Sequence, residues 1–218
     1  AAAASGVGIY VSSNYGTDWT ITSAPSNLLW KSIAMSSSGE YMAAVVLGGG
    51  IYVSSGNGWS ITSAPQNLNW TSVSMSSSGE YIAAVAYNSS IYLSSNSGTN
   101  WNTIPNSVSY WTSVSMSSSG QYIAATSGAY SAEIIFISSN FGSTFATATA
   151  PSNSWISIAM SSSGQYIAVT GTGVGIYISS NFGSTFATAT APSNTCISIA
   201  MSSTGQYMAA CVYDGGGI

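Results

Sequence analysis

Few side chains in this sequence could act as acids, bases or nucleophiles. The chain has five acidic residues, one basic residue and no histidine. Histidine is the side chain best suited to proton transfer near neutral pH and the commonest metal ligand. Its absence argues against an ordinary hydrolase and leaves a pair of carboxylates, as in glycoside hydrolysis, as the remaining route to acid–base catalysis. The charged residues are Asp18, Lys31, Glu40, Glu80, Glu133 and Asp214.

The positions of these acids do not suggest a catalytic pair. Glu40 and Glu80 stand at the same place in two copies of a repeated turn, where the other copies have Gln121, Gln165 and Gln206. Asp18 lies in a turn and Asp214 in a loop, and Glu133, in the longest insertion, is expected to be a solvated loop charge. No D-x-D pattern indicates calcium ligands. We therefore expect no catalytic residues, no metal site and no cofactor, and hence no enzyme.

The net charge of −4 excludes other functions. With a single cation the chain cannot neutralise phosphates, which argues against nucleic-acid binding. No apolar run approaches the length of a membrane-spanning helix. A surface of hydroxyl and amide groups with little charge favours association, so we expect self-association or a glycan coat.

A repeated sequence determines the expected fold. The string M-S-S-S/T-G-E/Q-Y recurs every 40 to 44 residues, and each copy is embedded in a unit with four short alternating apolar and polar segments separated by glycine-containing turns. This pattern predicts β-strands, and the frequent turns leave no room for helices. The five copies begin at Met35, Met75, Met116, Met160 and Met201.

Four antiparallel strands in about 40 residues are typical of a β-propeller blade. A β-solenoid is the alternative, but its strands stack in parallel, whereas the tight turns here favour hairpins. We predict an all-β, five-bladed propeller, closed because the N- and C-terminal strands share a blade. Both ends fall inside a unit, so an excerpt of a longer repeat protein is a second interpretation. The expected units are 30–69, 70–110, 111–154, 155–195, and 196–218 completed by 1–29.

One hairpin of each unit carries a resemblance to a known family. The segments S-S-N-Y-G-T-D-W (12–19), S-S-N-S-G-T-N-W (94–101) and S-S-N-F-G-S-T-F (138–145 and 179–186) resemble the Asp-box of sialidase-like, BNR-repeat and sortilin-type propellers. The resemblance implies a structural hairpin, in which asparagine ties down the turn, glycine is left-handed and the aromatic residue lies beneath. Sialidases also use an arginine triad, and this chain has no arginine. The Asp-box residues are Ser12, Asn14, Gly16, Trp19, Asn96, Gly98, Trp101, Asn140, Gly142, Phe145, Asn181, Gly183 and Phe186.

Two features suggest an oxidising compartment. Cys196 and Cys211 are placed symmetrically about a predicted hairpin turn, so we predict a disulfide between them, with two free thiols as the alternative. Asn69 and Asn88 begin N-glycosylation sequons, which we place in loops between strands. Together these features predict a secreted or cell-surface protein.

The four tryptophans that open the first strands allow two interpretations. A position filled in nearly every unit is typical of packing between blades, which is the interpretation we favour. If the protein binds glycans, these rings could stack on sugars beside Asn27, Asn67 and Asn153. The tryptophans are Trp30, Trp70, Trp111 and Trp155.

The leading functional hypothesis is a non-enzymatic extracellular module with a structural or adhesive role in a surface assembly or filament. Its motivation is the weakly charged hydroxyl surface together with the lack of catalytic side chains. The alternative is a lectin-like propeller that binds glycans.

Overall fold

The computed structural model describes all residues except 57, 106, 108, 129–133, 192–194 and 214–218. Every regular element among the described residues is a β-strand, and every pair of neighbouring strands is antiparallel. None of these elements is a helix that could cross a bilayer. The all-β, antiparallel prediction is therefore confirmed, and the parallel stacking of a solenoid is not observed in this part of the chain.

Four complete blades follow one another along the chain. Each is a sheet of four strands that pair in sequence order, as hairpin connections require. The first blade is β4 (Trp30–Met35), β5 (Met42–Gly49), β6 (Ile51–Ser54) and β7 (Trp59–Ile61), and the second is β8 (Leu68–Met75), β9 (Ile82–Ser89), β10 (Ile91–Ser94) and β11 (Asn102–Thr103). The third is β12 (Ser109–Met116), β13 (Ile123–Ser127), β14 (Ile135–Ser138) and β15 (Ala146–Thr147), and the fourth is β16 (Trp155–Met160), β17 (Ile167–Gly171), β18 (Gly175–Ser179) and β19 (Ala187–Thr188).

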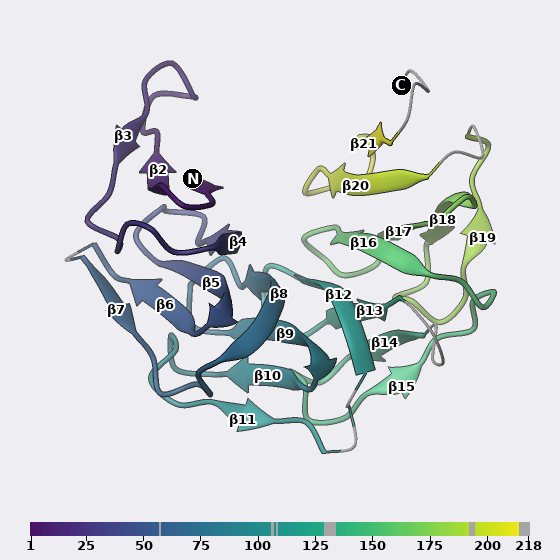
Figure 1. The fold of residues 1–218 in the computed structure, drawn as a ribbon. Helices are drawn as coiled ribbons and strands as arrows, with labels where there is room; N and C mark the ends of the chain where they lie inside the picture. The colour runs from purple at the N-terminus through teal and green to yellow at the C-terminus, as the bar shows by residue number, and fades with distance from the viewer. Residues whose placement is uncertain (57, 106, 108, 129–133, 192–194, 214–218) are drawn as a thin grey trace.

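The two ends of the chain form separate, smaller sheets. The N-terminal sheet contains β1 (Ala2–Ala4), β2 (Gly8–Val11) and β3 (Thr20–Ile21), and the C-terminal sheet contains β20 (Cys196–Met201) and β21 (Met208–Val212). In Figure 1 the blades follow an arc, with the N-terminal sheet (purple) at one end and β20 and β21 (yellow) at the other.

The prediction that the terminal strands share one blade and close a five-bladed ring is therefore wrong for the described residues. The reason lies in β1, which pairs with β2 from Ala2 opposite Tyr10 to Ala4 opposite Gly8. In a complete blade the second strand pairs with the third, so β1 takes the place of the second strand in the N-terminal sheet. Since β1 already occupies it, β21 has no free edge of β2 to join and pairs with β20 alone.

The first and second strands of each unit share a register shift. In the first blade the shift lies between Trp30 and Ser32, directly after the tryptophan, and the same shift recurs in the other blades and in the C-terminal sheet. An extra residue of this kind is a β-bulge, which bends and twists its strand. The bulge turns the start of the first strand toward the preceding blade, where Asn69 pairs with Leu47 and Ser109 with Ser89.

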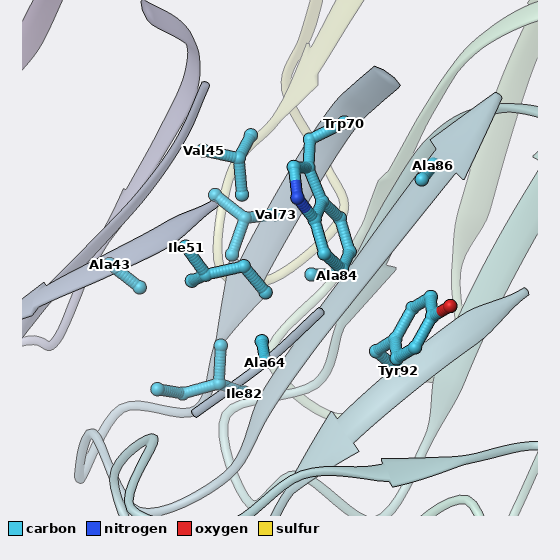
Figure 2. Packing of buried hydrophobic residues seen from close by; sticks show 10 residues of the cluster. All are labelled: Ala43, Val45, Ile51, Ala64, Trp70, Val73, Ile82, Ala84, Ala86 and Tyr92. Carbon is cyan, nitrogen blue, oxygen red and sulfur yellow. The ribbon is translucent and has the colours of Figure 1, made fainter. Parts of the chain in front are cut away.

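The hydrophobic core lies between blades rather than within one sheet. Figure 2 shows one such layer, in which Val45 and Ile51 of the first blade meet Trp70 and Val73 of the second. Equivalent layers join the second blade to the third, the third to the fourth, and each terminal sheet to its neighbour. Each blade is therefore stabilised mainly by the apolar side chains of the blades beside it.

A ladder of hydrogen bonds runs from one repeated turn to the next. The backbone N–H of Ser37 donates to the carbonyl oxygen of Ser77 at 3.0 Å, and the same bond recurs from Ser77 to Ser118, from Ser118 to Ser162 and from Ser162 to Ser203. The turns are themselves fixed by a serine whose hydroxyl accepts the N–H of the tyrosine five residues later, as Ser76 does from Tyr81 at 3.0 Å.

The four later turns of the ladder also pack on a tyrosine of the preceding blade. Gly79 is left-handed, with a φ of 81°, and a Cβ built on it would lie 2.5 Å from the Cβ of Tyr41. Only glycine allows this approach. The same arrangement places Gly120 on Tyr81, Gly164 on Tyr122 and Gly205 on Tyr166.

Candidate functional site

The described carboxylates are all exposed and lie in three different sheets or turns. Glu40 and Glu80 follow the repeated turn, where the backbone N–H of Glu80 is held by Ser78 Oγ at 3.2 Å. Asp18 accepts a hydrogen bond from the Asn14 side chain at 2.7 Å. Glu133 and Asp214 lie outside the described residues. Among the described residues there is no group of three or more histidine, cysteine, aspartate or glutamate side chains that could hold a metal.

The four first-strand tryptophans do not offer their rings to solvent. Their exposed fractions are 0% for Trp70, Trp111 and Trp155 and 3% for Trp30. Trp70 packs edge-on against Tyr92 with ring centroids 4.9 Å apart, and its indole N–H donates to the carbonyl oxygen of Gly49. The stacking of sugars on these rings is therefore ruled out by burial, while their packing role agrees with the layers between blades.

The two cysteines are free thiols, so the predicted disulfide is wrong. The register shift in β20 places Cys196 opposite Val212 and Cys211 opposite Ser198, so the symmetry of the sequence about the turn does not carry over to the strands. Cys196 is buried and Cys211 is exposed. Burial, and to a lesser extent the nearby Cys211, raises the pKa of Cys196 above its ordinary value.

The two sequon asparagines lie in strands rather than in the predicted loops. Asn69 is the second residue of β8, and Asn88 is the last but one of β9, in a left-handed conformation with a φ of 53°. Both are exposed and stand where neighbouring blades pair, at the bulged ends of β8 and β9. The prediction that glycans could reach them remains open to experiment.

The Asp-box-like hairpins have the geometry expected from their sequence. Ser138 Oγ accepts the N–H of Gly142 at 2.9 Å, and Asn140 Oδ1 accepts the N–H of Thr144 at 3.0 Å. The same two bonds recur in the hairpins of Ser12, Ser94 and Ser179. The aromatic residue that ends the motif packs in a layer between blades in three of these hairpins, at Trp101, Phe145 and Phe186, whereas Trp19 is 48% exposed. In two hairpins its indole N–H donates to the turn glycine, from Trp19 to Gly16 and from Trp101 to Gly98.

The residue before each hairpin glycine has a backbone conformation that was not predicted from the sequence. Phe141 and Phe182 are left-handed, with φ of 57° and 59°, although bulky side chains rarely adopt this conformation. Tyr15 and Ser97 hold the equivalent places with φ of 58° and 54°. The signal was present in the Asp-box alignment, where this position is variable in type but three times aromatic.

Three of these residues, Ser97, Phe141 and Phe182, border grooves between neighbouring blades. We number the grooves by the blades that they separate. Groove 2/3 has a volume of about 340 Å³ and is bordered by Tyr81 and Leu93 of the second blade and by Phe141 of the third. Groove 3/4, of about 320 Å³, has Tyr122 and Phe182 in the same places. Groove 1/2, of about 400 Å³, has Tyr41 but carries Ser97 where the others carry phenylalanine.

The aromatic rings in grooves 2/3 and 3/4 are paired across the blade boundary. The centroids of Tyr81 and Phe141 are 5.0 Å apart, and those of Tyr122 and Phe182 are 4.8 Å apart with the rings inclined by 29°. Phe141 is 45% exposed and Phe182 39% exposed. Among the described residues, no side chain that borders the three grooves is charged. The arrangement combines aromatic rings, hydroxyl groups and open space, which is suited to an uncharged polar ligand.

Neither the family models nor the curated proteins include a match to this chain. Among solved structures, 800 chains match. One is described as an ancestral GH74 enzyme, a propeller-type glycoside hydrolase; it is 18% identical, with a TM-score of 0.66 over 83% of this chain and 27% of that chain. The chain thus spans about a quarter of the length of that enzyme. At this identity the likeness shows the fold alone, which is propeller-like.

This comparison corrects one expectation drawn from composition. The lack of histidine and arginine led to the prediction that the chain is not an enzyme, but a chain with a similar fold is a GH74 enzyme. The fold therefore does not exclude catalysis.

Proposed function

We propose that this chain is an extracellular repeat module with a structural or adhesive role, and that it self-associates. The observation that carries the proposal is the distribution of exposed apolar side chains. The two terminal sheets and their turns expose large apolar residues on a chain of almost no charge, a combination that marks interaction surfaces. These residues are Val7, Tyr15, Trp19, Ile21, Ile197, Tyr207, Met208 and Tyr213.

Tyr207 illustrates why these surfaces favour a partner. It is 71% exposed, whereas its counterparts in the blades lie under the turn of the following unit. A second apolar or backbone surface placed on this ring would remove it from water, as the internal turns do for Tyr41 and Tyr122.

Sedimentation velocity over a range of protein concentrations tests this proposal. We expect the sedimentation coefficient to rise with concentration and Tyr207→Ser to reduce the rise. Tyr87→Ser is the control, because Tyr87 is an exposed tyrosine of a complete blade, 39% exposed. A chain that stays monomeric at all concentrations, or an equal effect of both variants, would contradict the proposal.

The hairpin geometry supports membership of the Asp-box propellers as a further part of this proposal. Serine accepts the N–H of the turn glycine in four hairpins, which is the structural role that the Asp-box resemblance implies. Replacing Asn140 by alanine should remove the acceptor for the Thr144 N–H and destabilise the hairpin by about 1 kcal/mol. Chemical denaturation of this variant measures the effect.

Glycan binding is a second candidate function. The uncharged grooves between blades favour it, since neutral sugars need hydroxyl and aromatic partners rather than ion pairs. The extracellular location that both functions require is tested by secretion from eukaryotic cells, followed by mass measurement before and after removal of N-glycans. The exposed Asn69 and Asn88 are the expected sites.

A further inference from the structure

We propose that grooves 2/3 and 3/4 are binding sites for neutral pyranose sugars, in which Phe141 and Phe182 stack on the apolar face of a sugar ring. This inference rests on the candidate glycan-binding function and names its site and ligand class. Groove 1/2, which has a serine at the same position, provides an internal comparison.

Phe141 and Phe182 both adopt a left-handed backbone conformation. A left-handed conformation is unfavourable for a residue with a large side chain, and the hairpin 94–101 has Ser97 at this position without loss of the turn. The hairpin therefore does not need phenylalanine for its own geometry. Such strained residues cluster at binding sites, where the surrounding structure holds them in place.

Phe141 and Phe182 are held at their backbones and by contacts with Tyr81 and Tyr122, while their rings remain accessible. The N–H of Phe182 donates to the carbonyl oxygen of Gln165 at 3.0 Å, and the N–H of Phe141 donates to Gln121 at the same distance. The adjacent Gly183 lies so close to the preceding blade that a Cβ would meet Ile137 Cδ1 at 2.6 Å. A ring fixed in this way loses little conformational freedom when a ligand binds.

Groove 3/4 combines one accessible face of an aromatic ring with polar neighbours. One face of Phe182 is covered by Tyr122, with which it is stacked, so its other face is the one available to a ligand. Groove 3/4 is also bordered by Ser139 and Ser184, whose side chains carry hydroxyl groups. A pyranose with equatorial hydroxyls presents C–H groups on its faces and hydroxyls around its edge, which matches this combination of an aromatic ring and polar neighbours.

The absence of charge among the residues that border the grooves selects the ligand class. An anionic sugar would lose its hydration without gaining a cationic partner in grooves 2/3 and 3/4. We therefore expect neutral glycans to bind and acidic glycans to be rejected.

Isothermal titration with cellohexaose, a neutral sugar with equatorial hydroxyls, and with an oligogalacturonate of similar length tests the proposal. Phe141→Leu and Phe182→Leu remove the rings but keep apolar side chains. Each should weaken cellohexaose binding by roughly threefold to tenfold, the contribution of one aromatic contact. The control Tyr15→Leu changes the equivalent residue of the N-terminal sheet, which borders none of the three grooves, and should leave the affinity unchanged.

The internal comparison supplies a gain-of-function test. Ser97→Phe gives groove 1/2 the aromatic residue of the other two grooves, and its left-handed φ of 54° is close to those of Phe141 and Phe182. We expect an additional binding event for cellohexaose in this variant. Folding of each variant is checked by its thermal unfolding.

The possible results show whether the proposed site or the glycan-binding function itself is wrong. If cellohexaose binds and the double variant Phe141→Leu, Phe182→Leu retains full affinity, the proposed site is wrong although glycan binding stands. If neither cellohexaose nor a neutral α-linked oligosaccharide such as maltohexaose binds to the unmodified chain, both the site and the glycan-binding function are wrong. Tighter binding of the oligogalacturonate would overturn the ligand class.

Discussion

The interior blades and the two terminal sheets share one repeat sequence but differ in how completely they are packed. In the interior, Tyr41, Tyr81 and Tyr122 lie against the turn glycines of the following blades. In the C-terminal sheet Tyr207 is exposed, and in the first blade, which follows the N-terminal sheet, a Cβ on the turn glycine Gly39 would meet only Met35 Sδ, at 3.7 Å. The same residues therefore differ in their contribution to stability according to whether a neighbouring unit is present.

Replacing a tryptophan is expected to give the largest difference in unfolding free energy between the interior blades and the terminal sheets. Trp111 is fully buried between the second and third blades, so Trp111→Ala should lower the free energy of unfolding by about 3–5 kcal/mol. Trp19 of the N-terminal sheet is 48% exposed, and Trp19→Ala should have a much smaller effect. Chemical denaturation measures both. Equal losses would show that the terminal sheet is packed as tightly as the interior.

The turn glycines should show the next largest difference. Gly120→Asn keeps a residue that tolerates the left-handed φ of 82° but drives its Cβ into Tyr81, so we expect a loss of about 1–3 kcal/mol. Gly39→Asn has a φ of 77° and open space, and should change stability by no more than about 0.5 kcal/mol. The same denaturation measurement applies, and a large loss for Gly39→Asn would contradict this interpretation.

A stabilising change is expected in the fourth blade. In the third blade, Thr112 Oγ1 donates to the carbonyl oxygen of Trp155 at 3.0 Å and contacts Thr126 Oγ1 at 3.1 Å. The fourth blade has Ile156 in place of Thr112, and the buried hydroxyl of Thr170 has no hydrogen-bond partner among the described residues. Ile156→Thr should supply one and raise the free energy of unfolding by about 1 kcal/mol.

Ile156→Val is the matched control, because it alters the same side chain without adding a hydroxyl. It should leave Thr170 unpaired and give no gain in a thermal unfolding experiment. A gain of equal size in both variants would mean that side-chain shape, rather than the hydrogen bond, limits stability at this position.

The smallest difference in unfolding free energy is expected for the serine hydroxyls in the ladder of hydrogen bonds between turns. Ser77 Oγ donates to the carbonyl oxygen of Ser118 at 2.9 Å in the interior. Ser77→Ala should therefore cost about 0.5 kcal/mol, since the bond is exposed to water. Ser203→Ala, in the last described turn of the ladder, should cost less, because no hydrogen bond donated by its hydroxyl is found among the described residues. Repeated thermal unfolding of both variants is needed to resolve a difference of this size.

Local features of the fold were predictable from the sequence, because they depend on residues close together in the chain. The S-S-S-G and S-S-N-x-G turns fix hairpins through their own hydroxyl and amide groups, as the bonds of Ser76 and Asn140 show. The repeat period then gives the number of strands in each blade.

Features that depend on competition between distant segments were not predictable. Whether β1 or β21 occupies the second position of the N-terminal sheet depends on packing that the repeat pattern leaves undecided. The bulge that separates Cys196 from Cys211 shifts a register by one residue, which residue counting cannot detect. The grooves were missed because Phe141 and Tyr81 come from different blades and meet only in the folded chain.

The ladder of turns has a direction, since each N–H points to the carbonyl oxygen of the following unit. Every interior unit therefore presents the same backbone N–H donor on one side and the same carbonyl acceptor on the other, so its two interfaces are equivalent to those of its neighbours. Whole units can be duplicated or excised by recombination, because the new neighbours present matching donors and acceptors. An insertion of a few residues in a first strand would instead displace the turn and its hydrogen bond to the next unit. Changes in the length of such proteins are therefore easiest in steps of one entire unit.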